Sequence, residues 1–293
     1  MIRKTVEKVR KILDRGDKPP LFILSIYKRH ILFLIAVIWI ALAGYGAYFR
    51  YFMVLPQSSV DLMPKFELSL TEQKILVLAP HCDDETLGVG GLMQRAKEQN
   101  SEIKVVIVTD CNKSKIGATR KNESIEALKE LGIDRQSLIF WDFPEKESSK
   151  KKNPQNMSLK QAIDQEIESF KPTLIIALHS DDTHIDHKNT GIFTSELVHD
   201  KYQKIKIAYY LIHYNFLRYP TPTGLHFDYY LTPPARLVSF SNKWYILDLS
   251  QEEEDNKQNA ILKYRSQLSL KNPILHEMLL DFVRQNELFM IQN

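Results

Sequence analysis

Short β-branched segments alternate with amphipathic segments along the middle of the chain, and this alternation constrains the fold most strongly. The β-branched segments are 74–79, 103–109, 137–141 and 173–178. Apolar residues at helical spacing characterise the segments between them, 90–100, 119–132 and 158–170. Strands that alternate with helices form a mostly parallel sheet covered by helices. The sequence therefore predicts an α/β fold.

We divide the chain of 293 residues into four parts. They are a basic segment over 1–30, a transmembrane helix over 31–50, a linker over 51–73 and one α/β domain over 74–293. The linker contains Pro56 and Pro64, which interrupt regular structure. The length and the ordinary composition, with 44% hydrophobic residues, fit a folded domain of this size.

Residues 31–49 carry no charge over 19 positions, and about 20 apolar residues span a bilayer as a helix. The first 50 residues hold 10 of the 39 Lys and Arg residues but only 3 of the 36 Asp and Glu residues. Nearly all of these cations precede the apolar run, and only Arg50 follows it closely. The positive-inside rule then predicts a cytoplasmic N-terminus, a single membrane span and a domain outside the cytoplasm.

A cleaved signal peptide is the alternative, because Ala41-Leu42-Ala43 resembles a cleavage site. The basic segment before it is long for a signal peptide, so we favour an anchor. Beyond residue 50 acidic residues outnumber basic ones, and this argues against a nucleic-acid partner. The two cysteines are too few for a disulfide framework and leave the redox compartment open. The oligomeric state also stays open.

Two clusters of polar residues follow predicted strands. "HCDDE" (81–85) follows the segment 74–79, and "HSDDTHIDH" (179–187) follows the segment 173–178. In parallel α/β sheets, ligands bind beyond the carboxyl ends of the strands. Two independent strands thus bring His- and Asp-rich turns to one edge, where we expect a functional site.

These residue types suit a catalytic metal ion, which usually has three protein ligands and one open position. His81 and Asp84 are close enough in sequence to chelate one ion, and either His184 or His187 supplies the third ligand. Asp83 could then accept a proton from a water molecule that the ion polarises. This chemistry would permit hydrolysis of a carbonyl compound at neutral pH.

Helix capping is the plainer explanation for the same aspartates. Asp83 or Asp84 could cap a helix that begins near Thr86, and Asp182 or Thr183 could cap one that begins at Ile185.

Five ordered motifs resemble the PIG-L/LmbE-like family of zinc-dependent N-acetylglucosaminyl deacetylases. The first, "APHCDDETLGVGG", is similar to its His-Pro-Asp-Asp-Glu signature, and "DDTHIDHKNTG" to its His-Pro-Asp-His motif. "RKNESIEALKELG" (120–132), "KQNAILKYRSQ" and "NELF" resemble further family segments. The resemblance covers residues 74–290 and implies a Rossmann-like fold.

The resemblance also implies roles for individual residues. His81, Asp84 and His187 would hold Zn²⁺, although another divalent ion such as Fe²⁺ would also suit them. Asp83 would be the general base. The remaining implied catalytic residues are His184, which would stabilise the oxyanion, and Asp186, which would orient an imidazole.

Four neighbouring residues complete the candidate site. Arg120 matches a substrate-binding arginine, the alternative being a surface cation paired with Glu123. His213 follows another strand-like segment and is a candidate substrate contact. We expect Glu85 to support a ligand or a local amide. Cys82 stands where the family has proline, and we interpret it as a buried small apolar residue and not as a ligand.

The function implied is removal of the N-acetyl group from an N-acetylglucosamine-containing glycolipid or glycan by a membrane-anchored enzyme. Two alternatives remain open. The chain could be a metal-dependent amidase acting on a non-sugar amide, since the motifs specify a carbonyl and not a sugar. It could also be a non-catalytic carbohydrate-binding protein that keeps the fold.

Overall fold

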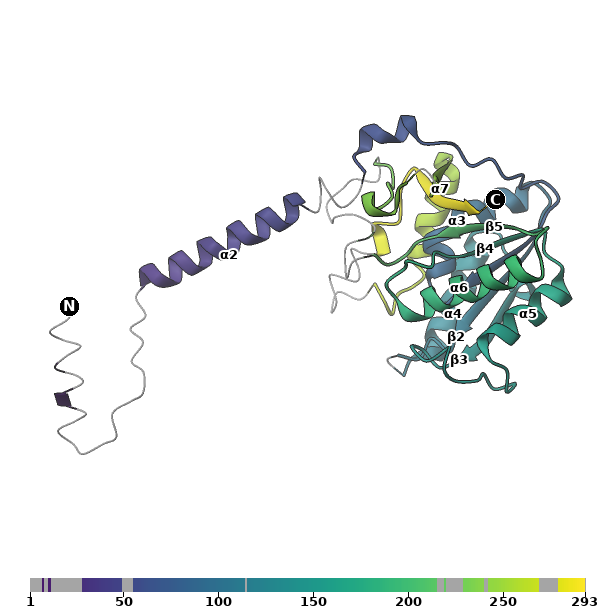
Figure 1. The fold of residues 1–293 in the computed structure, drawn as a ribbon, viewed down its shortest axis with the longest axis horizontal. Helices are drawn as coiled ribbons and strands as arrows, with labels where there is room; N and C mark the ends of the chain where they lie inside the picture. Colours follow the sequence, from purple (N-terminus) through teal and green to yellow (C-terminus); the bar gives the residue numbers. More distant parts are fainter. Residues whose placement is uncertain are drawn as a thin grey trace. The chain divides into compact units, whose positions relative to one another are not determined.

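The computed structural model describes residues 7, 10, 11, 28–48, 55–113, 115–214, 219, 229–239, 242–268 and 279–292. The chain divides into two compact units, Met1–Ala47 and Tyr48–Asn293. The predicted division into four parts stays a prediction. The second unit contains the α/β domain and is described first (Figure 1).

One seven-stranded sheet forms the centre of the second unit. Its strands are β1 (Lys74–Ala79), β2 (Glu102–Thr109), β3 (Leu138–Phe143), β4 (Leu174–Leu178), β5 (Lys206–Tyr210), β6 (Trp244–Asp248) and β7 (Asn286–Gln292). The order is β3-β2-β1-β4-β5-β7-β6. The first five are parallel, and β7 pairs antiparallel with both β5 and β6. The predicted mostly parallel sheet is confirmed.

Helices cover both faces of the sheet. They are α3 (Asp84–Glu98), α4 (Gly117–Glu130), α5 (Leu159–Phe170), α6 (Ile185–Asp200) and α7 (Gln251–Ile261), with short 3₁₀ helices at Gln57–Leu62, Arg135–Ser137 and Ala235–Leu237. Alternate residues of β1 enter two separate cores. Ile75 and Val77 pack in the core under α3, α4 and α7, whereas Leu76 and Leu78 pack in the core under α5 and α6.

The predicted strands and helices all occur, with boundaries shifted by a few residues. α3 begins at Asp84, two residues before the start expected near Thr86, so the polar cluster itself starts the helix. His179 packs at the end of β4, buried against the Trp244 ring with 5.4 Å between ring centroids.

In the predicted linker, Val60 and Leu70 are buried. The amide of Phe66 donates to the carbonyl of Ile246 at 2.8 Å. This part of the chain therefore packs against the domain.

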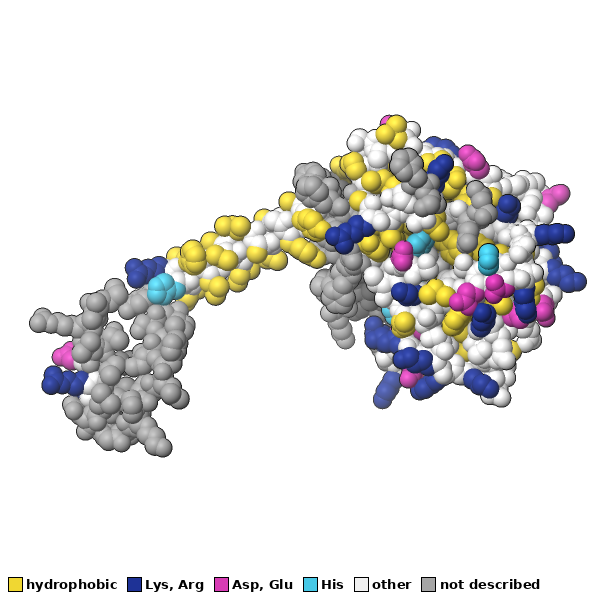
Figure 2. All heavy atoms as spheres, in the orientation of Figure 1, with side chains coloured by type: hydrophobic (Ala, Val, Ile, Leu, Met, Phe, Trp, Pro, Cys, Tyr) yellow, Lys and Arg dark blue, Asp and Glu magenta, His cyan; other side chains and the backbone are white. Residues whose placement is uncertain are grey.

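The first unit contains α2 (Lys28–Tyr48), a helix of 21 residues with a mean hydropathy of 2.2. It is long and apolar enough to cross a membrane, a property that signal sequences share. Hydrophobic side chains lie along the visible side of this helix in Figure 2.

Glycines permit close contacts beside the two polar clusters. A Cβ atom at Gly88 would lie 2.1 Å from the Tyr210 ring, and one at Gly91 would lie 2.3 Å from Leu249. Both glycines therefore permit close packing, whereas Gly90 has room for a methyl group. Gly191 in α6 is the most restrictive, because its Cβ would lie 2.3 Å from the backbone oxygen of Leu178 in β4.

We predict that Gly191→Ala lowers the free energy of unfolding by about 1–3 kcal/mol, because the backbone of β4 cannot yield as a side chain can. The control is Gly90→Ala, whose Cβ would meet Lys257 at an ordinary 3.4 Å. Chemical denaturation of both variants measures the difference. Equal stability of Gly191→Ala and the wild type would contradict this packing.

Candidate active site

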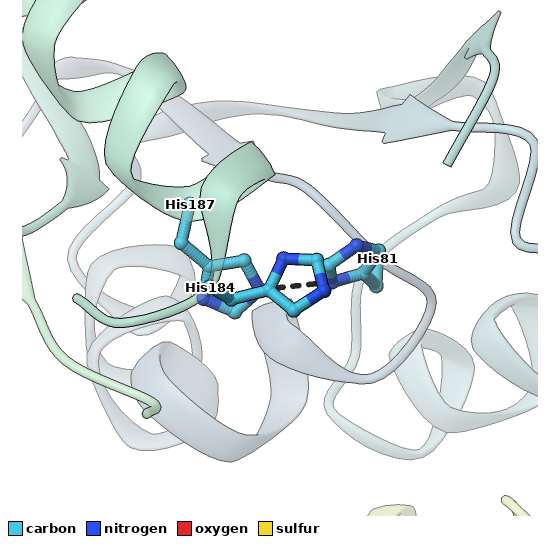
Figure 3. Close-up of side chains that lie close together, drawn as sticks. All are labelled: His81, His184 and His187. Atoms are coloured by element: carbon cyan, nitrogen blue, oxygen red, sulfur yellow. Dashed lines mark hydrogen bonds between the residues drawn. The ribbon is translucent and has the colours of Figure 1, made fainter. Parts of the chain in front are cut away.

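The candidate site lies where the strand order changes direction. The chain moves from β1 to β2 and β3 on one side and to β4 and β5 on the other. Ligands bind in the crevice at such a switch point, outside the carboxyl ends of the strands. His81 follows β1, and His184 and His187 lie at the start of α6 after β4. Figure 3 shows the three imidazoles side by side.

Three ligand atoms converge at the centre of the site. His187 Nε2 lies 2.8 Å from His81 Nδ1. Asp84 Oδ2 lies 3.1 Å from His187 Nε2 and 3.3 Å from His81 Nδ1. Ligand atoms about 2.0–2.1 Å from a tetrahedral zinc ion are themselves about 3.3 Å apart. The triangle therefore has nearly the size that one such ion requires.

Two further carboxylates fix the tautomers of these histidines. Asp186 Oδ2 lies 3.3 Å from His81 Nε2, and Asp182 Oδ2 lies 3.0 Å from His187 Nδ1. A carboxylate only accepts hydrogen bonds, so these ring nitrogens carry the protons. The lone pairs of His81 Nδ1 and His187 Nε2 then face each other and the Asp84 carboxylate. Such a group is repulsive without a proton or a cation between its members.

The pKa shifts show the same attraction for positive charge. Burial by itself lowers the pKa of His81, but hydrogen bonds to Asp186 and Asp84 outweigh it and raise the pKa to about 9. Burial also lowers the pKa of His187, but the nearby carboxylates of Asp182 and Asp84 outweigh it and hold this pKa well above its usual range. A metal ion would replace these protons, and the donor set fits it.

A second grouping of ligands is looser. The ligand atoms of His81, His184 and His187 all lie within 4.8 Å of one another. The set that contains Asp84 is tighter, and each of its histidines has a carboxylate on its other nitrogen, as metal-bound histidines usually do. We therefore prefer Asp84 to His184 as the third ligand.

Asp83 lies beside the triangle and lines the pocket. Its side chain does not cap α3, so the capping explanation is wrong for this residue. Burial raises the pKa of Asp83 to about 6 against the lowering effect of Arg120. Its backbone has φ of 146°, a conformation that residues with a side chain rarely adopt and that occurs mainly at functional sites.

Arg120 is buried and points into the site. Its Nη2 lies 3.5 Å from Asp83 Oδ2 and donates to Gln267 Oε1 at 3.2 Å. Glu123, the alternative partner, instead accepts hydrogen bonds from Ser266 at 2.7 and 2.6 Å. Arg120 is therefore not a surface cation paired with Glu123.

His184 and His213 both line the pocket. His184, and not Asp182 or Thr183, occupies the N-cap position of α6, where its Nδ1 accepts the amide hydrogen of Asp186 at 3.3 Å. Its Nε2 is then free to carry a proton. The ring of His213 stacks on that of His187 with 5.0 Å between centroids.

Glu85 stabilises the turn formed by residues 81–84 through hydrogen bonds. It accepts the amide hydrogen of Asp83 at 3.0 Å and the Tyr264 hydroxyl at 2.8 Å. This is the local amide support expected of it.

Cys82 is buried as expected, but it is not a free thiol. It forms a disulfide with Cys111, 29 residues away, a pairing that the sequence did not predict. Two lone cysteines gave no sign of this pairing, because only the parallel pairing of β1 with β2 brings the loops after them together.

Sequence reasoning missed three residues of the site. Asp182 looked like a cap but holds His187. Glu145 follows β3 and lines the pocket together with Gln267. The alternation of strands and helices could have indicated Glu145, because it too follows a strand. The contact of Asp182 with His187 could have been recognised only from the three-dimensional structure.

The site opens into a pocket of about 330 Å³, within the usual range for small-molecule sites, about 300–1,000 Å³. Its lining combines polar side chains with five apolar ones. The apolar side chains are those of Leu87, Ile116, Ile212, Leu279 and Phe282. Such a pocket suits a ligand with both polar and apolar surfaces.

A parallel sheet with a His/Asp site at its switch point defines a Rossmann-like α/β protein with a candidate hydrolytic metal centre. Residues 76–198 match the PIG-L family, described as GlcNAc-PI de-N-acetylase. This match confirms the family resemblance that the motifs predict. No curated protein sequence matches the chain.

Solved structures share the fold at low sequence identity. The N,N'-diacetylchitobiose deacetylase from Pyrococcus horikoshii is 20% identical with a TM-score of 0.52, over 75% of this chain and 84% of that one. A deacetylase of teicoplanin biosynthesis is 17% identical with a TM-score of 0.54, over 74% and 97%. The A40926 pseudoaglycone deacetylase is 18% identical with a TM-score of 0.51, over 75% and 98%.

We predict that Asp182→Asn weakens Zn²⁺ binding about 10- to 100-fold. In either orientation the asparagine NH₂ group would meet backbone N–H groups, because those of Ile212 and His213 donate to Asp182 Oδ2 at 3.1 and 2.9 Å and that of His184 donates to Oδ1 at 2.8 Å. Competition with a chromophoric chelator measures the affinity. The exposed neighbour provides the control, Asp181→Asn. Unchanged affinity of Asp182→Asn would contradict the proposed orientation of His187.

Proposed function

We propose that this chain is a membrane-anchored, metal-dependent N-deacetylase that removes the acetyl group from an N-acetylglucosamine-containing glycolipid or glycan. The observation that carries the proposal is the convergence of three lone-pair donors beside a buried carboxylate. His81 Nδ1, Asp84 Oδ2 and His187 Nε2 would hold Zn²⁺, or another divalent ion such as Fe²⁺. When bound, such an ion polarises a carbonyl group and lowers the pKa of water.

Asp83 is the proposed general base. Its carboxylate borders the pocket, and a pKa near 6 allows it to be ionised at neutral pH yet basic enough to take a proton from water. Arg120, 3.5 Å away, keeps that carboxylate oriented. Asp83 could then pass the proton to the departing amine nitrogen.

His184 is the proposed oxyanion stabiliser. Because its Nδ1 accepts a backbone hydrogen bond, its Nε2–H donates into the pocket. A preorganised donor of this kind favours the developing negative charge on the acetyl oxygen. Asp186 holds His81 in its ligating tautomer, and His213 would contact the substrate.

The amino-sugar substrate is supported by the family description and by solved deacetylases of the same fold. The mixed polar and apolar lining of the pocket agrees with a sugar that carries an apolar group. Cleavage of a non-sugar amide would use the same residues. A non-catalytic carbohydrate-binding role does not account for a buried base beside three metal-ligand atoms.

Three features support a domain outside the cytoplasm. They are the apolar helix α2, the basic residues before it and the disulfide between Cys82 and Cys111. Disulfides form and persist in oxidising compartments. An anchor and a cleaved signal peptide would both deliver the domain there.

We predict that Asp83→Asn lowers kcat for acetate release from N-acetylglucosaminyl substrates about 10²- to 10⁴-fold, the usual effect of losing a general base. Bound metal should be retained, because Asp83 is not among the three ligands. The assay compares full-length wild type, Asp83→Asn and the control Asp181→Asn. Wild-type kcat in Asp83→Asn would overturn the mechanism.

The topology predicts the behaviour of a reporter enzyme that functions only in the cytoplasm. Fused after Asn293, it should be inactive, whereas the same reporter fused before Met1 should be active. Activity of the C-terminal fusion would place the domain in the cytoplasm instead.

A further inference from the structure

The Cys82–Cys111 disulfide joins two loops that carry site residues. Cys82 lies between His81 and Asp83, in the loop after β1. Cys111 lies in the loop after β2, just before the α4 helix that carries Arg120. Both cysteines are fully buried, with 5.9 Å between their Cα atoms. The crosslink therefore adjoins the pocket without forming part of its surface.

The backbone of both cysteines is bound by the same guanidinium group. Arg120 Nη2 donates to the carbonyl of Cys82 at 3.1 Å, and Nη1 lies 3.5 Å from the carbonyl of Cys111. Gln267 Nε2 also donates to the carbonyl of Cys82, at 3.0 Å. The position of Arg120 beside Asp83 thus depends on two carbonyls that the disulfide holds together.

The backbone at Asp83 needs neighbouring contacts to hold its conformation. Asp83 has φ of 146°, and an unusual backbone conformation persists only where its surroundings determine it. The contacts of Cys82 fix the peptide before Asp83, and Glu85 holds the amide of Asp83 itself. The crosslink restrains the backbone before Asp83. Without it, rotation at Asp83 would turn the carboxylate away from the proposed metal ligands His81 and Asp84.

We propose that the Cys82–Cys111 disulfide is a positioning crosslink for the active site. It fixes the 81–84 turn so that Asp83 and Arg120 face the substrate while His81 and Asp84 face a shared ion. This inference rests on the proposed function for its catalytic part. A disulfide that only stabilised the fold would change the melting temperature and leave the site unaltered.

The test compares full-length proteins in detergent. Cys82→Ala/Cys111→Ala removes the crosslink and adds no thiol that could bind metal. Val108→Ala is the matched control, because it removes buried atoms from β2 in the opposite core and leaves the disulfide intact. Cys82→Pro/Cys111→Ala is the rescue variant, since proline stiffens the backbone at the position where the resembling motif has it.

Proline is compatible with the hydrogen bonds at this position. The amide of Cys82 donates to Cys111 Sγ at 3.1 Å, and it has no other acceptor in the described part of the chain. Replacing Cys111 removes that acceptor, so the missing N–H of proline should leave no carbonyl unpaired.

We expect the double-alanine variant to lose about 10- to 100-fold in kcat, with a smaller change in KM, because the base is displaced while the pocket remains. Its Co²⁺ complex should show an altered visible absorption spectrum and weaker binding. The proline variant should recover much of the kcat and of the Co²⁺ affinity. Val108→Ala should keep the wild-type kcat, Co²⁺ spectrum and Co²⁺ affinity despite a lower melting temperature.

Wild-type kcat and Co²⁺ spectrum in a folded double-alanine variant would overturn the proposal. If that variant does not fold, Cys82→Ser/Cys111→Ser, which keeps nearly the same volume and also adds no thiol, gives the same comparison. If wild type releases no acetate from any substrate, the proposed function fails. The Co²⁺ spectrum and affinity would still decide whether the crosslink positions the ligands.

Discussion

The active site of this domain depends on a buried group of ligand atoms that attracts positive charge. His81 Nδ1, Asp84 Oδ2 and His187 Nε2 lie within 2.8 to 3.3 Å of one another. Asp182 and Asp186 accept the hydrogen on the outer nitrogen of His187 and of His81, so the inner nitrogen of each ring faces this group and attracts a proton or a cation. Burial removes the water that would otherwise screen the group. A divalent cation is the natural partner for such an arrangement.

The parallel sheet makes this convergence possible. His81 and His187 are 106 residues apart in sequence, yet they follow neighbouring strands that end at the same edge. Gly191 lets α6 approach the end of β4 closely enough to deliver His187. The disulfide and Arg120 join the same region from the side of β2. The site is thus built by loops, but its dimensions are set by strand pairing and helix packing.

Strand-end reasoning predicted the central residues because it needs only local patterns. A β-branched run followed by His81 and Asp84, and a second run followed by His187, suffice once the sheet is parallel. The family motifs then selected His187 over His184 as the proposed ligand. The antiparallel β6 and β7 were not predicted, because no helical crossover marks them in the sequence.

Contacts between residues far apart in the chain could not be predicted from sequence patterns. Cys82 and Cys111 gave no pairing signal, and Asp182 had the local context of a helix cap. The cap is in fact His184, whose Nδ1 accepts the amide hydrogen of Asp186 in place of a carboxylate. The disulfide pairing and the contacts of Asp182 with Ile212 and His213 depend on which loops the fold brings together. Neither follows from residue type or spacing.

Anomalous X-ray diffraction from crystals grown with Zn²⁺ tests the central claim most directly. We expect one strong peak at the zinc edge about 2.0–2.2 Å from His81 Nδ1, Asp84 Oδ2 and His187 Nε2. Asp83 should lie beside that peak without contacting it. A peak bound by His184 in place of Asp84, or none within the triangle, would contradict the proposed metal site.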